Sequence, residues 1–121
     1  MERVDGIGGF FFVARDPAGL ARWYADHLGV AEVPTSYDAD VWVQTEGETV
    51  FAPFPADAGD DVPIGPSGWG INFRVRDLTA MVAQLRAAGI EVAVDETEYP
   101  NGWFAQLADP EGNAIQLWQP T

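Results

Sequence analysis

GFFFVARD at residues 9–16 returns in altered form as GINFRVRD at residues 70–77. Both runs are rich in apolar residues, as β-strands are, and both end in Arg-Asp followed by a helical pattern. Self-similarity of this kind is the signature of a repeated supersecondary unit. The chain therefore contains one structural module twice.

A helix is predicted after each repeated run. Asp16 and Asp77 are favoured N-cap residues. Apolar residues spaced three and four apart follow each Asp, and a glycine suited to the left-handed position ends each pattern. We predict helices over residues 17–28 and 78–88.

Strand candidates follow both predicted helices. They cover residues 31–37, 41–45 and 48–54 in the first half, and 91–97, 103–108 and 114–118 in the second. Turn signals lie between the last two candidates of each half. We predict one α+β domain over residues 1–121, made of module one (about 5–54), a linker (55–68) and module two (about 69–120). Two βαβββ modules would form a curved eight-stranded mixed sheet, with helices on the convex side and a concave cleft opposite.

The composition limits the classes of partner that this chain can bind. The chain has 19 Asp and Glu against 6 arginines and no lysine, a net charge of −13, so we expect no nucleic-acid partner. An acidic field draws cationic ligands, although acidity also serves solubility alone. No run of apolar residues is long enough to span a membrane. The first residues lack a basic segment followed by an apolar one, which favours the cytoplasm.

The residue inventory also excludes several chemistries. Without cysteine or lysine, the chain has neither a thiolate nucleophile nor a Schiff-base amine. His27 is the single histidine, so a multi-histidine metal site within one chain is impossible. Ser36 and Ser67 are the only serines, and neither lies in a Gly-x-Ser-x-Gly motif.

The sequence resembles the vicinal oxygen chelate superfamily, which includes glyoxalases, bleomycin-resistance proteins and ring-cleaving dioxygenases. The resemblance rests on motifs in family order: FFVARD (11–16), HLGV (27–30), VRD (75–77), AAGI (87–90) and DPEGN followed by IQL (109–117). It spans nearly the whole chain. It implies the paired-module fold, a small-molecule cleft and a homodimer.

The metal ligands of that superfamily are missing here. Metal-dependent members place a ligand on the first and last strand of each module. The matching positions are Gly9, Phe51, Gly70 and Gln116. Glycine and phenylalanine offer no donor, and a lone neutral amide is a poor ligand. We therefore expect no metal and no other cofactor.

Strand parity predicts which side chains line the cleft, because alternate residues share a face. In the last hairpin, a loop over 109–113 would pair Gln106 with Gln116 and Phe104 with Trp118. In the first module, a turn at Gly47 would pair Gln44 with Thr49 and Trp42 with Phe51. The predicted ligand-binding residues are Phe11, Trp42, Gln44, Phe51, Asn72, Arg74, Phe104, Gln106, Gln116 and Trp118.

Three functions fit these residues. The first is a metal-free protein that binds a small organic molecule, cationic or aromatic in character, and sequesters a drug or toxin. The second is a glyoxalase-like lyase, isomerase or dioxygenase-type enzyme with a non-standard metal site, drawing on carboxylates such as Glu46, Glu48 or Asp95. The third is a protein-interaction module. The residues leave open whether the chain catalyses a reaction.

Overall fold

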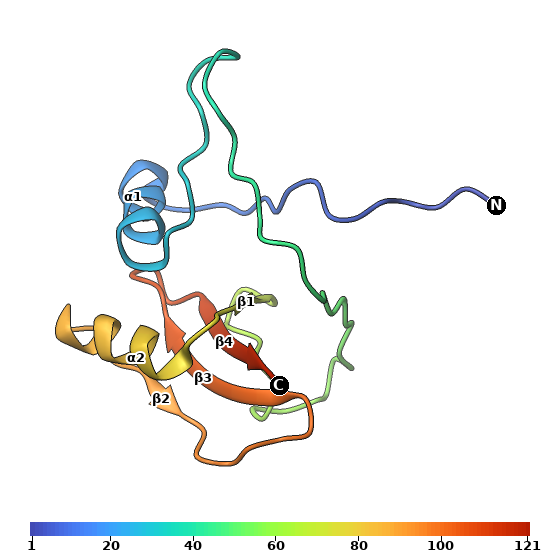
Figure 1. Ribbon diagram of the computed structural model, residues 1–121, viewed down its shortest axis with the longest axis vertical. Coiled ribbons are helices and arrows are strands. Elements are labelled where there is room, and N and C mark those ends of the chain that lie inside the picture. Colours follow the sequence, from blue (N-terminus) through green and yellow to red (C-terminus); the bar gives the residue numbers. More distant parts are fainter.

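The computed structural model describes residues 1–121 and contains two helices and one sheet (Figure 1). Elements follow the order α1 (Pro17–Leu28), β1 (Gly70–Arg74), α2 (Leu78–Ala87), β2 (Ala93–Val94), β3 (Gly102–Ala108) and β4 (Ala114–Pro120). No helix combines the length and apolar composition that a membrane span requires.

Both helices begin at the predicted aspartates. The Asp16 carboxylate accepts a 3.0 Å hydrogen bond from the Gly19 N–H, and Asp77 accepts one of the same length from the Ala80 N–H. Each bond satisfies an N–H group that the first helical turn leaves free. Gly29 ends α1 with a φ of 71°, a left-handed conformation that favours glycine. The cap interpretation of both Asp residues is confirmed.

The sheet has four strands in the order β1-β4-β3-β2. β3 and β4 form an antiparallel hairpin, and β2 pairs antiparallel with β3. β1 runs parallel to β4, with Asn72 opposite Gln116 and Arg74 opposite Trp118. The predicted hairpin register is confirmed: Gln106 lies opposite Gln116 and Phe104 opposite Trp118.

The hydrophobic core lies between the sheet and the helices. Leu85, Ile115 and Leu117 are almost completely buried there. Leu20 and Tyr24 of α1 join the same cluster, so the first helix packs on the sheet of the second half. In Figure 1 both helices lie on one side of the sheet. Alternation along β3 and β4 therefore turns Gln106 and Gln116 to the face away from the helices.

Two sets of hydrogen bonds hold α1 in this position. The Glu111 carboxylate, in the β3–β4 loop, accepts bonds of 2.7 and 3.0 Å from the N–H groups of Arg15 and Asp16. The buried Asp109 carboxylate accepts a 2.7 Å bond from the Tyr24 hydroxyl. Both acceptors lie in the turn that the sequence predicts as a hairpin loop. The turn thus also anchors the helix of the first half.

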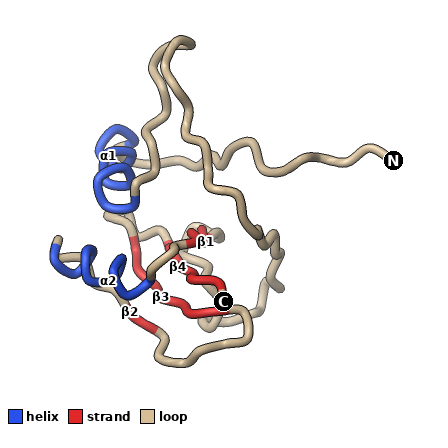
Figure 2. Tube along the Cα trace, in the orientation of Figure 1, coloured by secondary structure: helices blue, strands red, loops and turns tan.

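The prediction of an eight-stranded sheet is wrong for this structure. Residues 1–16 and 30–69 form no strand, so the predicted strands at 31–37, 41–45 and 48–54 and the pairs Gln44–Thr49 and Trp42–Phe51 are absent (Figure 2). In the second half, the candidate at 91–97 shortens to β2.

The packing of α1 gives a physical reason for the missing strands. A sheet with one buried face needs a layer to cover that face. The only helix of the first half already covers the sheet of the second half. Apolar side chains of the first half remain in solvent as a result: Phe11 is 92%, Val13 96%, Val43 83% and Phe51 87% exposed.

Candidate functional site

The candidate site is built on the β3–β4 hairpin, whose register is fixed by its turn. The Asp109 carboxylate accepts hydrogen bonds from the N–H groups of Glu111 (2.8 Å) and Asn113 (3.0 Å), and the Asp109 N–H donates to the Asn113 carbonyl at 3.0 Å. Asp109 therefore fixes the loop over residues 109–113 that the sequence predicts. A shift of one residue would turn every side chain of the hairpin to the other face.

A row of three amides crosses the face away from the helices. Asn72 on β1 lies opposite Gln116 on β4, and Gln116 lies opposite Gln106 on β3. The Asn72 side-chain N–H donates a 2.7 Å hydrogen bond to Gln116 Oε1. Gln116 thus bonds Asn72, and its Nε2 group stays available as a donor. Gln106 is exposed, so the amide row (Asn72, Gln116 and Gln106) presents donors and acceptors to the solvent.

An aromatic row lies beside the amide row, two residues earlier on β3 and two residues later on β4. The rings of Phe104 and Trp118 are nearly parallel, with an interplanar angle of 6° and centroids 6.3 Å apart. The Trp118 indole N–H donates a 2.7 Å bond to the Asn101 carbonyl, and the side chain is buried. Arg74 lies on the other side of Trp118, in β1. Six predicted site residues therefore share this face: Asn72, Arg74, Phe104, Gln106, Gln116 and Trp118.

The four predicted site residues of the first half do not join this face through strand pairing. Phe11, Trp42, Gln44 and Phe51 all lie on segments without strands, and all are exposed. The hairpin that would place Trp42, Gln44 and Phe51 in the cleft does not form here, nor does the opening strand that would place Phe11 there. These four residues are therefore not brought to the sheet face in the single chain.

The residues at the superfamily's metal-ligand positions do not fit a metal. Gly9 and Gly70 have no side chain, and a Cβ atom on Gly70 would overlap the Pro63 carbonyl. Gln116 already accepts a bond from Asn72, and Phe51 is exposed. No group of three or more His, Cys, Asp or Glu side chains is arranged to hold an ion. These four positions therefore offer a single side-chain oxygen donor, that of Gln116.

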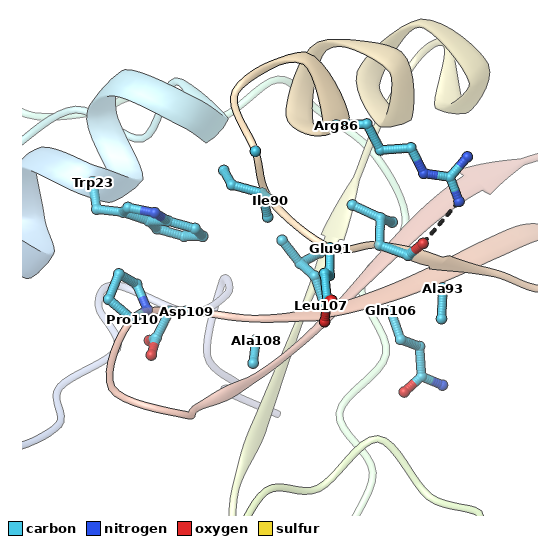
Figure 3. Close-up of a pocket in the computed structure, with 12 residues that line it drawn as sticks. Trp23, Arg86, Ile90, Glu91, Ala93, Gln106, Leu107, Ala108, Asp109 and Pro110 are labelled. Carbon is cyan, nitrogen blue, oxygen red and sulfur yellow. Dashed lines mark hydrogen bonds between the residues drawn. The ribbon is translucent and has the colours of Figure 1, made fainter.

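A cavity of about 980 Å³ opens at the edge of the sheet between α1, the end of α2 and β3 (Figure 3). In the figure, Trp23 and Ile90 lie above β3, and Gln106 points away from them toward the amide face. Arg86 donates a 2.8 Å bond to the Val92 carbonyl beside the cavity. The lining residues are Trp23, Arg86, Gly89, Ile90, Glu91, Val92, Ala93, Gln106, Leu107, Ala108, Asp109 and Pro110.

Sequence reasoning missed most of this cavity. Gln106 is its only lining residue among the predicted ligand contacts. No local pattern in the sequence predicts that Trp23 lines a cavity with the loop after α2. Its place there depends on α1 packing against the sheet of the second half. Gln106 connects the cavity with the amide row.

The glyoxalase-like domain family matches residues 9–118. The crystal structure of TnmS3, an antibiotic-binding protein from Streptomyces sp. CB03234, aligns over 100% of both chains with 21% identity and a TM-score of 0.62. A lactoylglutathione lyase from Agrobacterium tumefaciens aligns over 98% of this chain and 96% of its own, with 18% identity and a TM-score of 0.61.

At these identities the solved structures establish the fold alone. No curated protein matches the chain. The family match covers most of the sequence and includes both repeated runs and the closing hairpin. The chain therefore belongs to the glyoxalase-like domain family, within the vicinal oxygen chelate superfamily.

Proposed function

We propose that this protein binds a small organic molecule on the sheet face away from the helices, without a metal, and sequesters a drug or toxin. The amide row is the observation that carries the proposal. Three amides in register on three adjacent strands give a planar polar surface, and an aromatic row borders it. A few placed polar groups beside apolar walls are typical of small-molecule sites.

The free donors and acceptors of the amide row suit a ligand with carbonyl or hydroxyl groups. Gln116, with its Nε2 group, and the exposed Gln106 lie directly opposite each other across the hairpin. Directly opposed side chains on antiparallel strands have Cβ atoms about 5 Å apart, within the span of one planar molecule. TnmS3 is an antibiotic-binding protein on the same fold, and we propose a similar role here.

A ligand screen followed by tryptophan fluorescence and native mass spectrometry tests this function. Gln106→Ala and Gln116→Ala should each weaken a hit about fivefold, because each removes a hydrogen-bonding group worth about 1 kcal/mol. Gln84→Ala, on the exposed side of α2, is the matched control and should leave the affinity unchanged. A screen without hits, or equal effects of all three substitutions, contradicts the proposal.

We also propose that the working form is a homodimer. The exposed apolar residues of the first half exceed what a single soluble chain normally leaves in water. A second copy of the chain offers the same unpaired segments, and exchange between copies would give them strands to pair with. Such pairing would bring Trp42, Gln44 and Phe51 to a sheet face as the sequence predicts.

Sedimentation tests the dimer. The wild-type protein should sediment as a dimer at micromolar concentration, and Phe51→Asp should shift it to the monomer. Val4→Asp introduces the same charge at an exposed residue outside the predicted strands and should leave the dimer intact. A wild-type monomer would contradict this part of the proposal.

A further inference from the structure

The row that contains Phe104 and Trp118 continues to both edges of the sheet. Arg74 lies opposite Trp118 on the β1 side. On the β2 side, the Asp95 N–H donates a 3.0 Å hydrogen bond to the Phe104 carbonyl, one residue beyond the paired Val94 and Ala105. Asp95 therefore extends the row, and the two rings have a cationic group at one end and an anionic group at the other.

The Arg74 guanidinium already has hydrogen-bond acceptors within the chain. It donates hydrogen bonds of 3.0 Å to the carbonyls of both Glu48 and Thr45. A Cβ atom on Gly47 would overlap this guanidinium, so the turn over residues 45–48 closes directly onto it. These carbonyls take the place of the acceptors that a ligand would otherwise offer to Arg74. Arg74 therefore serves this turn and is not the group that selects a ligand.

The charge at the Asp95 end has only neutral partners. Its carboxylate accepts 3.0 Å from the Thr97 N–H and 2.8 Å from the Tyr99 hydroxyl. These two bonds keep the pKa of Asp95 below its usual range, so the carboxylate is ionised at neutral pH. Both bonds also fix its position. The available charge on this row is thus negative.

Aromatic surface lies next to that carboxylate. The Tyr99 ring meets the Phe104 ring edge-on, with centroids 5.9 Å apart and an interplanar angle of 70°. Tyr99 is 40% exposed and Phe104 is half-buried, whereas Trp118 is covered. A ligand would therefore contact Tyr99 and Phe104 in front of Trp118. A carboxylate beside accessible rings suits a cation, which gains from both the charge and the ring faces.

We propose that Asp95, Tyr99 and Phe104 select a planar aromatic ligand that carries a protonated nitrogen. The protonated nitrogen lies against the Asp95 carboxylate, the rings lie against Phe104 and Tyr99, and the carbonyl or hydroxyl groups reach Gln106. The overall charge of −13 raises the local concentration of such cations. This inference rests on the proposed function, because it names the ligand class of the same face.

Two probes of the same tricyclic shape test the ligand class. Proflavine is a cation at neutral pH, and acridone is neutral. We expect proflavine to bind about tenfold more tightly than acridone, the effect of one ion pair with one cation–π contact. Asp95→Asn keeps the shape and removes the charge, so it should abolish that preference while the affinity for acridone stays the same.

Glu98→Gln is the matched control for overall charge. It removes one carboxylate from the same exposed loop and should leave the preference for proflavine intact. Equal binding of the two probes, or equal effects of Asp95→Asn and Glu98→Gln, overturns the inference. If proflavine fails to bind while the wider screen finds neutral or anionic ligands, this inference fails and the proposed function stands. A screen with no ligand at all overturns both.

Discussion

The Tyr24 hydroxyl donates a 2.7 Å hydrogen bond to the Asp109 carboxylate, and 85 positions of sequence separate the two residues. Both side chains are buried. Asp109 accepts further bonds from Glu111 and Asn113, so its carboxylate is fully satisfied inside the protein. This contact joins the helix of the first half to the turn that fixes the hairpin register. Its loss would affect both.

Tyr24→Phe should lower the free energy of unfolding by about 1–3 kcal/mol, because a buried charged acceptor loses one of its donors. Urea denaturation followed by circular dichroism measures the change. Tyr37→Phe is the control: Tyr37 is fully exposed and should tolerate the substitution. Equal stabilities of the two variants would show that the buried bond contributes nothing.

Stability should also fall at alkaline pH. Burial, the hydrogen bond to Asp109 and its negative charge raise the pKa of Tyr24 well above its usual 10.0. The unfolded chain therefore releases the Tyr24 proton as the pH rises through 10, while the folded chain keeps it. The free energy of unfolding is unaffected by this titration below pH 10 and decreases progressively above pH 10.

Denaturation curves between neutral pH and pH 11 measure this loss. Tyr24→Phe removes the titrating group and should show a smaller decrease over the same range. A wild-type protein whose stability stays constant above pH 10 would contradict the prediction.

Gly47→Ala should release the turn from Arg74. A methyl group at this position overlaps the guanidinium, which lies at the end of a flexible side chain and can move away. The stability change should therefore stay below about 1 kcal/mol. Exchange of the Arg74 guanidinium protons with water should accelerate, because they lose their acceptors at Thr45 and Glu48. Gly8→Ala, with nothing within 4 Å of the new methyl group, should leave exchange unchanged.

Metal analysis after dialysis should find well below one divalent ion per chain. Gly9, Phe51, Gly70 and Gln116 offer at most one side-chain oxygen among them, whereas zinc sites use three or more protein ligands. Added zinc or cobalt should not raise the melting temperature. A stoichiometric ion whose binding depends on Gln116 would refute this.

The second half was predicted well because its signals are local. Asp77 caps α2, and the loop of 109–113 sets the hairpin register by counting alone. Helix α1 covers residues 17–28 as predicted, and α2 ends at Ala87, one residue before the predicted end. Caps and turns are decided within a few residues, and for that reason the sequence predicts them.

The first half could not be predicted in the same way. Alternation shows that segments such as 41–45 are suited to strands, but a strand needs a partner with the right edge. The position at which α1 packs determines which strand edge is left for these segments to pair with. That position depends on residues far away in the sequence. Asp95 and Tyr99 are absent from the predicted ligand contacts for a related reason. Their place beside Phe104 follows from the β2–β3 pairing, and no turn signal fixes that register.

The packing of α1 also affects synthesis on the ribosome. Leu20 and Tyr24 are made early, but the hairpin residues that bury them come near the end of the chain. Contacts so distant in sequence cannot form until almost all of the protein has left the exit tunnel. The residues of helix α1 must therefore remain unfolded in the nascent chain until then. Completion of β4 is thus the event that permits the whole domain to fold.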